Sequence, residues 1–173
     1  MKSSAPPHRA YTSRRTAGRA QLAAFADPYQ ASTKLSEPTV CRQCTAVYQG
    51  GRWNWNSRPE VAAEELCPAC QRVRDKIPAG IVTVHGEFSR QRKDEIISLA
   101  RHQEAAEIND HPLNRIMEVD ETRAGAGALT ITTTDIHLPR RIGEALARAF
   151  HGDLDMNFDQ DGYFVRVDWR PIA

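Results

Sequence analysis

The chain has 173 residues and a mass of 19.4 kDa, with a net charge of +1, a mean hydropathy of −0.56 and 40% hydrophobic residues. This length allows one domain or two small ones and excludes a large multidomain enzyme. The near-zero charge excludes a uniformly basic, histone-like protein, and no apolar run reaches the roughly 20 residues of a membrane-spanning helix. We therefore expect a soluble protein.

The predicted N-terminal tail, residues 1–36, holds six basic residues and one acidic residue, whereas the rest of the chain holds 17 basic and 21 acidic residues. Its Ala, Ser, Thr, Pro and Arg content predicts a segment that is disordered in isolation. Three interpretations stay open: a solvated leader, an organelle transit peptide, and an arm that binds polyanions through Arg14, Arg15 and Arg19. The start lacks the apolar stretch of a secretory signal, so we expect a cytoplasmic location.

Two CxxC pairs follow the tail, Cys41 with Cys44 and Cys67 with Cys70. Their spacing is close to that of zinc sites in which two turns supply four thiolates at the corners of a tetrahedron. Because four thiolates leave no position for water, we predict one structural Zn²⁺ bound by all four cysteines. A redox dithiol and an iron–sulfur cluster are the alternatives.

The segment between the pairs predicts the hairpin of a zinc ribbon, because Gly50-Gly51 separates two short runs of β-favouring residues. Arginine and aromatic side chains surround the cysteines, and this combination suits phosphate contact and base stacking. A tryptophan here can instead cover the metal turn and fill the small core. The candidate nucleic-acid contacts of the predicted ribbon, residues 37–78, are Arg42, Arg52, Trp53, Trp55, Arg72 and Arg74.

The remaining residues, 79–173, predict a separate α+β domain. The expected elements, in chain order, are a strand over 81–85, a helix over 89–108 capped by Ser89, a hairpin of 116–119 with 129–133, a helix from Pro139 to about Phe150 and a hairpin of 154–158 with 163–169. This order, βαββαβ plus one strand, matches the ferredoxin-like pattern. The predicted fold class is α+β, with an N-terminal four-cysteine zinc ribbon followed by a small ferredoxin-like domain.

The second half offers no set of residues that predicts catalysis. No spacing joins a general base to an oriented partner and a nucleophile. Asp135 stands just before the second helix, where capping of free backbone N–H groups explains it without chemistry. Arg140 and Arg141 oppose the helix dipole at that helix start and indicate an anionic partner, so they join the candidate nucleic-acid contacts. We predict that the protein is not an enzyme and has no small-molecule substrate.

Several motifs together resemble a bacterial family of short zinc-ribbon proteins, over about residues 40–170. They are Cys41-x2-Cys44, Gly51-Arg-Trp53-x-Trp55, Cys67-Pro-x-Cys70, Arg74-Asp-Lys-x-Pro-Ala-Gly80, His111-Pro-Leu…Arg115-Ile-Met117 and Thr132-Thr-Thr-Asp135-x-His-Leu138. That family is similar, more distantly, to the N-terminal zinc-binding region of the adaptor for nuclear export of the large ribosomal subunit. The resemblance implies a ribosome-associated protein with the four cysteines as zinc ligands. The adaptor's further cysteine pairs and later β-barrel modules have no counterpart here, so its export role is not implied.

Two functional hypotheses follow. The first is a non-enzymatic zinc-binding factor that associates with the ribosome or ribosomal RNA, with the arginines as phosphate contacts and the tail in a groove. The alternative is a zinc-dependent, regulatory module that binds another protein or DNA. Neither hypothesis involves a membrane.

Overall fold

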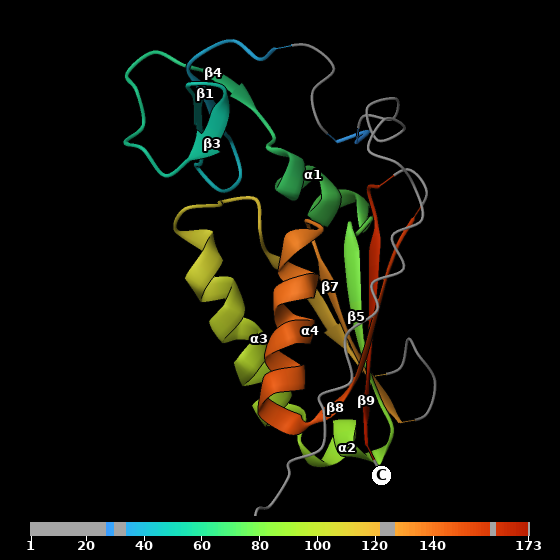
Figure 1. Cartoon of the computed structure of the whole chain (residues 1–173). Helices are drawn as coiled ribbons and strands as arrows, with labels where there is room; N and C mark the ends of the chain where they lie inside the picture. Colours follow the sequence, from blue (N-terminus) through green and yellow to red (C-terminus); the bar gives the residue numbers. More distant parts are fainter. Residues whose placement is uncertain (1–26, 30–33, 122–126, 160–161, 173) are drawn as a thin grey trace, which may run out of the picture.

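The computed structural model describes residues 27–29, 34–121, 127–159 and 162–172, which contain two β-sheets and four α-helices. A mixed α/β composition is therefore confirmed. The smaller sheet lies at one end of the larger one, on the side of α1 (Pro68–Asp75), as Figure 1 shows. Within the described ranges, every helix is too short or too polar to cross a membrane.

The smaller sheet and α1 form the cysteine module, which we define as residues 37–78. Its strands lie in the order β3-β2-β1-β4 and comprise β1 (Thr39–Cys41), β2 (Val47–Gln49), β3 (Arg52–Asn54) and β4 (Ala63–Glu65). β2 and β3 pair in an antiparallel register across Gly50 and Gly51, whose φ angles are 64° and 77°. Glycine is favoured at such angles because it has no Cβ. The predicted hairpin between the CxxC pairs is therefore confirmed.

The larger sheet and its helices form the α/β domain, residues 79–172. Its elements are β5 (Gly80–His85), α2 (Glu87–Gln91), α3 (Lys93–Ile108), β6 (Ile116–Asp120), β7 (Ala128–Thr133), α4 (His137–Phe150), β8 (Gly152–Phe158) and β9 (Val165–Pro171). The strand order is β6-β7-β5-β9-β8. After α4 the chain forms the edge strand β8. It then reverses direction, and β9 pairs antiparallel to β8 and parallel to β5, between the two.

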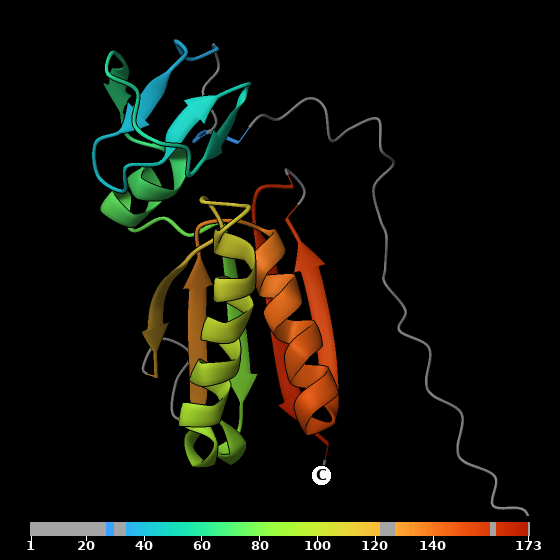
Figure 2. The same ribbon diagram turned by 90° about the vertical axis from the view of Figure 1, so that its left-hand side faces the viewer.

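Helices α3 and α4 lie side by side on one face of this sheet (Figure 2). Alternate strand residues point to that face, as the twofold period of a strand requires, and they include the fully buried Val82, Val84 and Ile131. Trp169 is also fully buried, with its ring 4.9 Å from that of Phe88. The core of the α/β domain is separate from the small core around the cysteines.

The predicted helix over 89–108 is two helices, and its predicted cap is wrong. α2 begins at Glu87 after Gly86, which has a φ of 82°. Arg92 interrupts the helix, and α3 begins at Lys93. Ser89 is buried inside α2 and donates its hydroxyl to the Gly86 carbonyl. The cap predicted for the last helix is present, because an oxygen of Asp135 accepts the N–H groups at the start of α4.

The structured part of the chain includes residues that the sequence placed in the tail. Asp27 and Tyr29 contact Arg72 of α1, and Leu35 packs against the cysteine cluster. A boundary at residue 37 is therefore too late, since residues of the predicted tail complete the surface of α1. Most of the tail, residues 1–26, lies outside the described residues.

Candidate metal centre

The four cysteine sulfurs converge on one point of the cysteine module. All four Sγ atoms lie within 4.8 Å of one another, and those of Cys44 and Cys67 are 3.7 Å apart. A tetrahedral zinc site with Zn–S bonds near 2.3 Å separates its sulfurs by about 3.8 Å. Cys41, Cys67 and Cys70 are buried and Cys44 is partly buried. The spacing and the donor atoms therefore fit a four-coordinate structural metal.

Local backbone structure aims each pair of cysteines inward. Cys41 ends β1 and opens a tight turn, in which its N–H donates to the Ala46 carbonyl and Thr45 takes a φ of 67°. Cys67 is the N-cap of α1, with Pro68 at the first helical position, and its sulfur accepts the N–H of Cys70 at 3.4 Å. Proline suits that position because the first helical N–H has no partner in the helix. The second CxxC pair therefore begins a helix.

Arg115, a residue of the α/β domain, reaches the same sulfurs. Its guanidinium donates to Cys67 Sγ at 3.3 Å, to Cys44 Sγ at 3.4 Å and to Cys70 Sγ at 3.6 Å. A four-thiolate site with a divalent cation carries a net negative charge, which a guanidinium offsets. Arg115 thus joins the two domains at the centre where a metal would bind.

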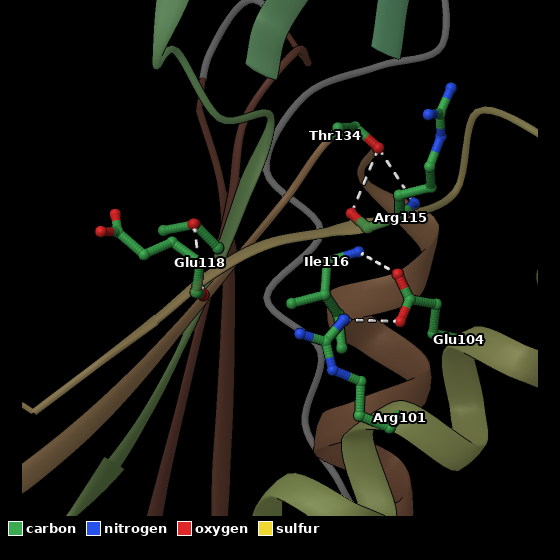
Figure 3. Close-up of polar contacts among 7 residues, drawn as sticks. Arg101, Glu104, Arg115, Ile116, Glu118 and Thr134 are labelled. Atoms are coloured by element: carbon green, nitrogen blue, oxygen red, sulfur yellow. Dashed lines mark hydrogen bonds and ion pairs between the residues drawn. The ribbon is translucent and has the colours of Figure 1, made fainter. Parts of the chain in front are cut away.

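Arg115 is held rigidly from its own side. The backbone N–H of Arg115 donates to the Thr134 hydroxyl at 3.0 Å, and the Thr134 N–H donates to the Arg115 carbonyl at 2.9 Å. The Nε of Arg115 donates to the Pro112 carbonyl at 2.8 Å. Figure 3 shows the Thr134 hydroxyl at the backbone of Arg115 and the next residue, Ile116, donating to Glu104 of α3. The backbone bonds hold the main chain of Arg115 and the Pro112 carbonyl orients its guanidinium, so little side-chain entropy is lost in the contact with sulfur.

Two further contacts join the domains beside Arg115. Leu113 packs against the buried cluster that contains the cysteines, and the indole Nε1 of Trp55 donates to the Ile108 carbonyl at 2.6 Å. Ile108 is the last residue of α3, and Leu113 lies between α3 and β6. Residues 108–115 of the α/β domain therefore contact the cysteine module.

The pKa values of the cysteine thiols in the cluster differ from one another. The hydrogen bond with Cys67 lowers the pKa of Cys44 to about 4, and Arg115 acts in the same direction. The same hydrogen bond and burial raise the pKa of Cys67, whereas burial raises the pKa of Cys70 to about 11. A metal must displace the remaining protons, since the thiolate is the ligand. Metal binding at this site therefore releases protons and weakens as the pH falls.

Two of the predicted nucleic-acid contacts lie in the interior. Trp53 is 8% exposed and stacks against Tyr48 with ring centroids 5.5 Å apart, so it fills the core of the cysteine module. Arg72 is 3% exposed, pairs with Asp27 at 2.7 Å and lies over the Tyr29 ring. These two side chains hold the module together and do not present a surface to a nucleic acid.

The other candidates of the cysteine module are at the surface. Arg42 and Arg52 are exposed and have no ion-pair partner among the described residues. Arg74 is exposed and pairs with Asp75. Trp55 is 41% exposed, although its Nε1 is bonded to Ile108. Part of the Trp55 side chain and two unpaired guanidiniums therefore remain available to a ligand.

The remaining candidates lie outside the cysteine module or outside the described residues. Arg140 and Arg141 lie on α4, where Arg140 pairs with Glu144 at 3.5 Å and Arg141 with Glu107 at 2.8 Å. Arg14, Arg15 and Arg19 fall outside the described residues. The structure thus divides the predicted nucleic-acid contacts into separate groups rather than one patch.

The sequence-based site omitted Arg115, although its motif contributed to the resemblance. Arg115 follows Cys70 by 45 residues and belongs to another domain, so no local spacing links it to the cysteines. A basic residue in a short loop between a helix and a strand is also too common to mark a contact.

Comparisons with family models, curated proteins and solved structures found no match to this chain.

Proposed function

We propose that this protein is a non-enzymatic zinc-binding factor that associates with ribosomal RNA. The observation that carries the proposal is the convergence of four cysteine sulfurs with the guanidinium of Arg115. Four thiolates would satisfy a tetrahedral Zn²⁺ completely, so the metal would have no open position for a substrate or water. Such a metal organises a binding surface and performs no chemistry.

Zinc is the metal that the donors favour. Four thiolates in a tetrahedral arrangement suit zinc or iron–sulfur chemistry, whereas magnesium and calcium require oxygen ligands. The four sulfurs surround a single point, which suits one ion better than a cluster of several irons. Cys41, Cys44, Cys67 and Cys70 would hold the ion, and Arg115 would offset its thiolate charge.

Exposed basic groups support RNA as the partner. Arg42 and Arg52 stand at opposite ends of the small sheet, and the half-exposed ring of Trp55 directly follows β3. Guanidiniums neutralise phosphates and aromatic rings stack on unpaired bases, and single-stranded RNA offers both. The more distant similarity of the resembled zinc-ribbon family to the export adaptor of the large ribosomal subunit favours ribosomal RNA within that class.

We also infer that the α/β domain is a variant of the ferredoxin-like fold. Its strand order, β6-β7-β5-β9, with α3 and α4 on one face supports the assignment. The extra strand β8 reverses the direction of β9. This fold serves many unrelated functions, so the assignment does not decide the partner.

Exposed apolar side chains favour the alternative of a protein partner. Val73 on α1 and Ile77 after it are 40% and 51% exposed, close to each other in the chain. Neighbouring apolar groups at a surface gain free energy when a partner removes them from water. A zinc-dependent protein-binding module would use this side of α1.

Sedimentation of a cell lysate through sucrose tests the proposal. We expect the full chain to comigrate with ribosomal subunits at low salt and to leave them at high salt, because phosphate contacts are salt-dependent. An Arg42→Gln/Arg52→Gln variant should dissociate at lower salt, whereas Arg90→Gln/Arg92→Gln, which removes the same charge from α2 and its end, should behave as wild type. Absence from every ribosomal fraction would overturn the proposal. Comigration that a Val73→Asp variant abolishes, with no effect of salt, would favour the protein partner.

A further inference from the structure

A hollow of about 380 Å³ lies on the helix side of the α/β domain. Its lining consists of Gln103 of α3 and, on α4, His137, Arg140, Arg141, Glu144 and Arg148. The α4 residues recur at intervals of three, four and seven, so they share one face of that helix. All six lining residues are polar or charged.

The charges around the hollow favour an anion. Three guanidiniums and one carboxylate line it, and Gln103 and His137 add further polar groups. Arg148 is exposed and has no ion-pair partner among the described residues. Arg140 is only loosely paired, since its Nη2 lies 3.5 Å from an oxygen of Glu144, whose side chain is 43% exposed. A ligand with negative oxygens can therefore take over these guanidiniums at small cost.

Arg141 is pre-oriented for such a ligand. Its Nε is 2.8 Å from Oε1 of Glu107, a carboxylate that is 8% exposed and whose other oxygen accepts from Asn114. A buried carboxylate cannot remain unpaired without a large free-energy cost, so this pair fixes the guanidinium at the edge of the hollow. A planar guanidinium held in this way suits the paired oxygens of a phosphate.

The lining also indicates the size class of the ligand. Sites for small metabolites are mostly apolar, with a few polar groups that orient the ligand. The described lining of this hollow has no apolar side chain, and the hollow is partly open to solvent. A phosphate on a long chain fits this arrangement better than an enclosed metabolite.

We propose that this hollow binds a phosphate group, and, resting on the proposed function, that the phosphate belongs to the backbone of the RNA partner. The site lies on the helices and not on the cysteine module, so the RNA would contact both domains. The metal-centred joint at Arg115 would then hold the two contact surfaces at a fixed distance.

The test uses the full, metal-loaded chain and an Arg140→Gln/Arg148→Gln variant. Both residues are exposed and neither pairs with a buried carboxylate, so the fold should be retained. The control is Arg90→Gln/Arg92→Gln, which removes the same charge from exposed arginines that do not line the hollow. Affinity for a short fluorescent RNA hairpin is measured against salt concentration, and binding of inorganic pyrophosphate is measured by calorimetry.

We expect the hollow variant to lose pyrophosphate binding and to lower the slope of log affinity against log salt by about 1 for each arginine that contacts a phosphate. The control should change neither. RNA binding with an unchanged slope in the hollow variant would overturn the hollow as an RNA contact while leaving the proposed function intact. Pyrophosphate binding without RNA binding would keep the phosphate site and refute the RNA function. Failure of both ligands in the wild-type protein would refute both.

Discussion

The guanidinium of Arg115 lies 3.3 Å from the sulfur of Cys67, and the two residues belong to different domains. The arginine also reaches Cys44 and Cys70, so it contacts both CxxC pairs at once. The site that organises the cysteine module therefore also docks this module on the α/β domain.

Replacement of Arg115 should weaken metal binding. Hydrogen bonds to metal ligands typically contribute about 10- to 100-fold in metal affinity, so Arg115→Ala should lower zinc affinity by a factor in that range. Arg115→Lys keeps the charge but cannot reach three sulfurs together, and an intermediate loss is expected. Competition with a chromophoric chelator measures the affinity. Arg92→Ala, an exposed arginine paired with Glu95, is the control, and an equal loss in that variant would refute the role of Arg115.

Loss of a cysteine should unfold one domain and spare the other. Cys67 is both a ligand and the N-cap of α1, so Cys67→Ser should lose about one equivalent of zinc and the order of residues 37–78. The α/β domain has a separate core around Val82 and Trp169 and should stay folded. Metal analysis and hydrogen exchange resolved along the chain measure both effects. Ser98→Ala on α3 is the matched control, and an unchanged metal content in Cys67→Ser would contradict the site.

The features that the sequence predicted correctly depend on neighbouring residues. Two-residue spacing places a cysteine pair on one turn, and Gly50-Gly51 allows a tight hairpin, whatever lies elsewhere in the chain. The cap at Asp135 is equally local, since it accepts N–H groups two and three residues on. Such local patterns can be recognised in a sequence because few other structures are compatible with them.

The features that the sequence did not predict depend on distant partners. The burial of Arg72 needs the carboxylate of Asp27, which is 45 residues away. Nothing in the sequence distinguishes the buried Arg72 from the exposed arginines around it. In the same way, nothing distinguishes the buried Trp53 from the exposed Trp55. The direction of β9 depends on where β8 pairs, which the strand pattern alone leaves open.

Loss of Asp27 should destabilise the cysteine module. The Arg72 side chain is 4% exposed, and without Asp27 its charge would remain buried with one bond to the Ile77 carbonyl and the Tyr29 ring. Hydrogen bonds to charged groups contribute about 1.5–3 kcal/mol, so Asp27→Ala should lower the free energy of unfolding by an amount in that range. Denaturant unfolding of the metal-loaded protein measures it. Glu87→Ala removes an exposed ion pair with Arg90 and should leave the midpoint nearly unchanged; equal effects would argue against a buried pair.

The tail prediction is best tested by deletion of residues 1–26, because this truncation retains Asp27. The removed segment has five basic residues and no acidic residue. If it is a polyanion-binding arm, its loss should flatten the salt dependence of RNA affinity by about 1 for each arginine that contacts a phosphate. A full-length chain with Arg14, Arg15 and Arg19 changed to Gln should reproduce most of this effect. The same slope before and after truncation would leave only the leader interpretations.

The cap of α4 should make stability depend on pH. Burial raises the pKa of Asp135, although its Oδ2 accepts the N–H groups of His137 and Leu138. An unfolded aspartate titrates near pH 4. In the range above that value the folded state therefore holds more protons than the unfolded state, and the free energy of unfolding falls as the pH rises.

Asp135→Asn should remove this fall with pH. The amide oxygen keeps an acceptor for the two N–H groups and carries no charge, so the variant should be at least as stable as wild type at neutral pH. Asp135→Ala also carries no charge but loses the acceptor, so it should be less stable than Asp135→Asn by about 1 kcal/mol at every pH. Urea unfolding of the metal-loaded protein at neutral and mildly acidic pH measures these differences. An Asn variant whose stability keeps the pH dependence of wild type would show that another group is responsible.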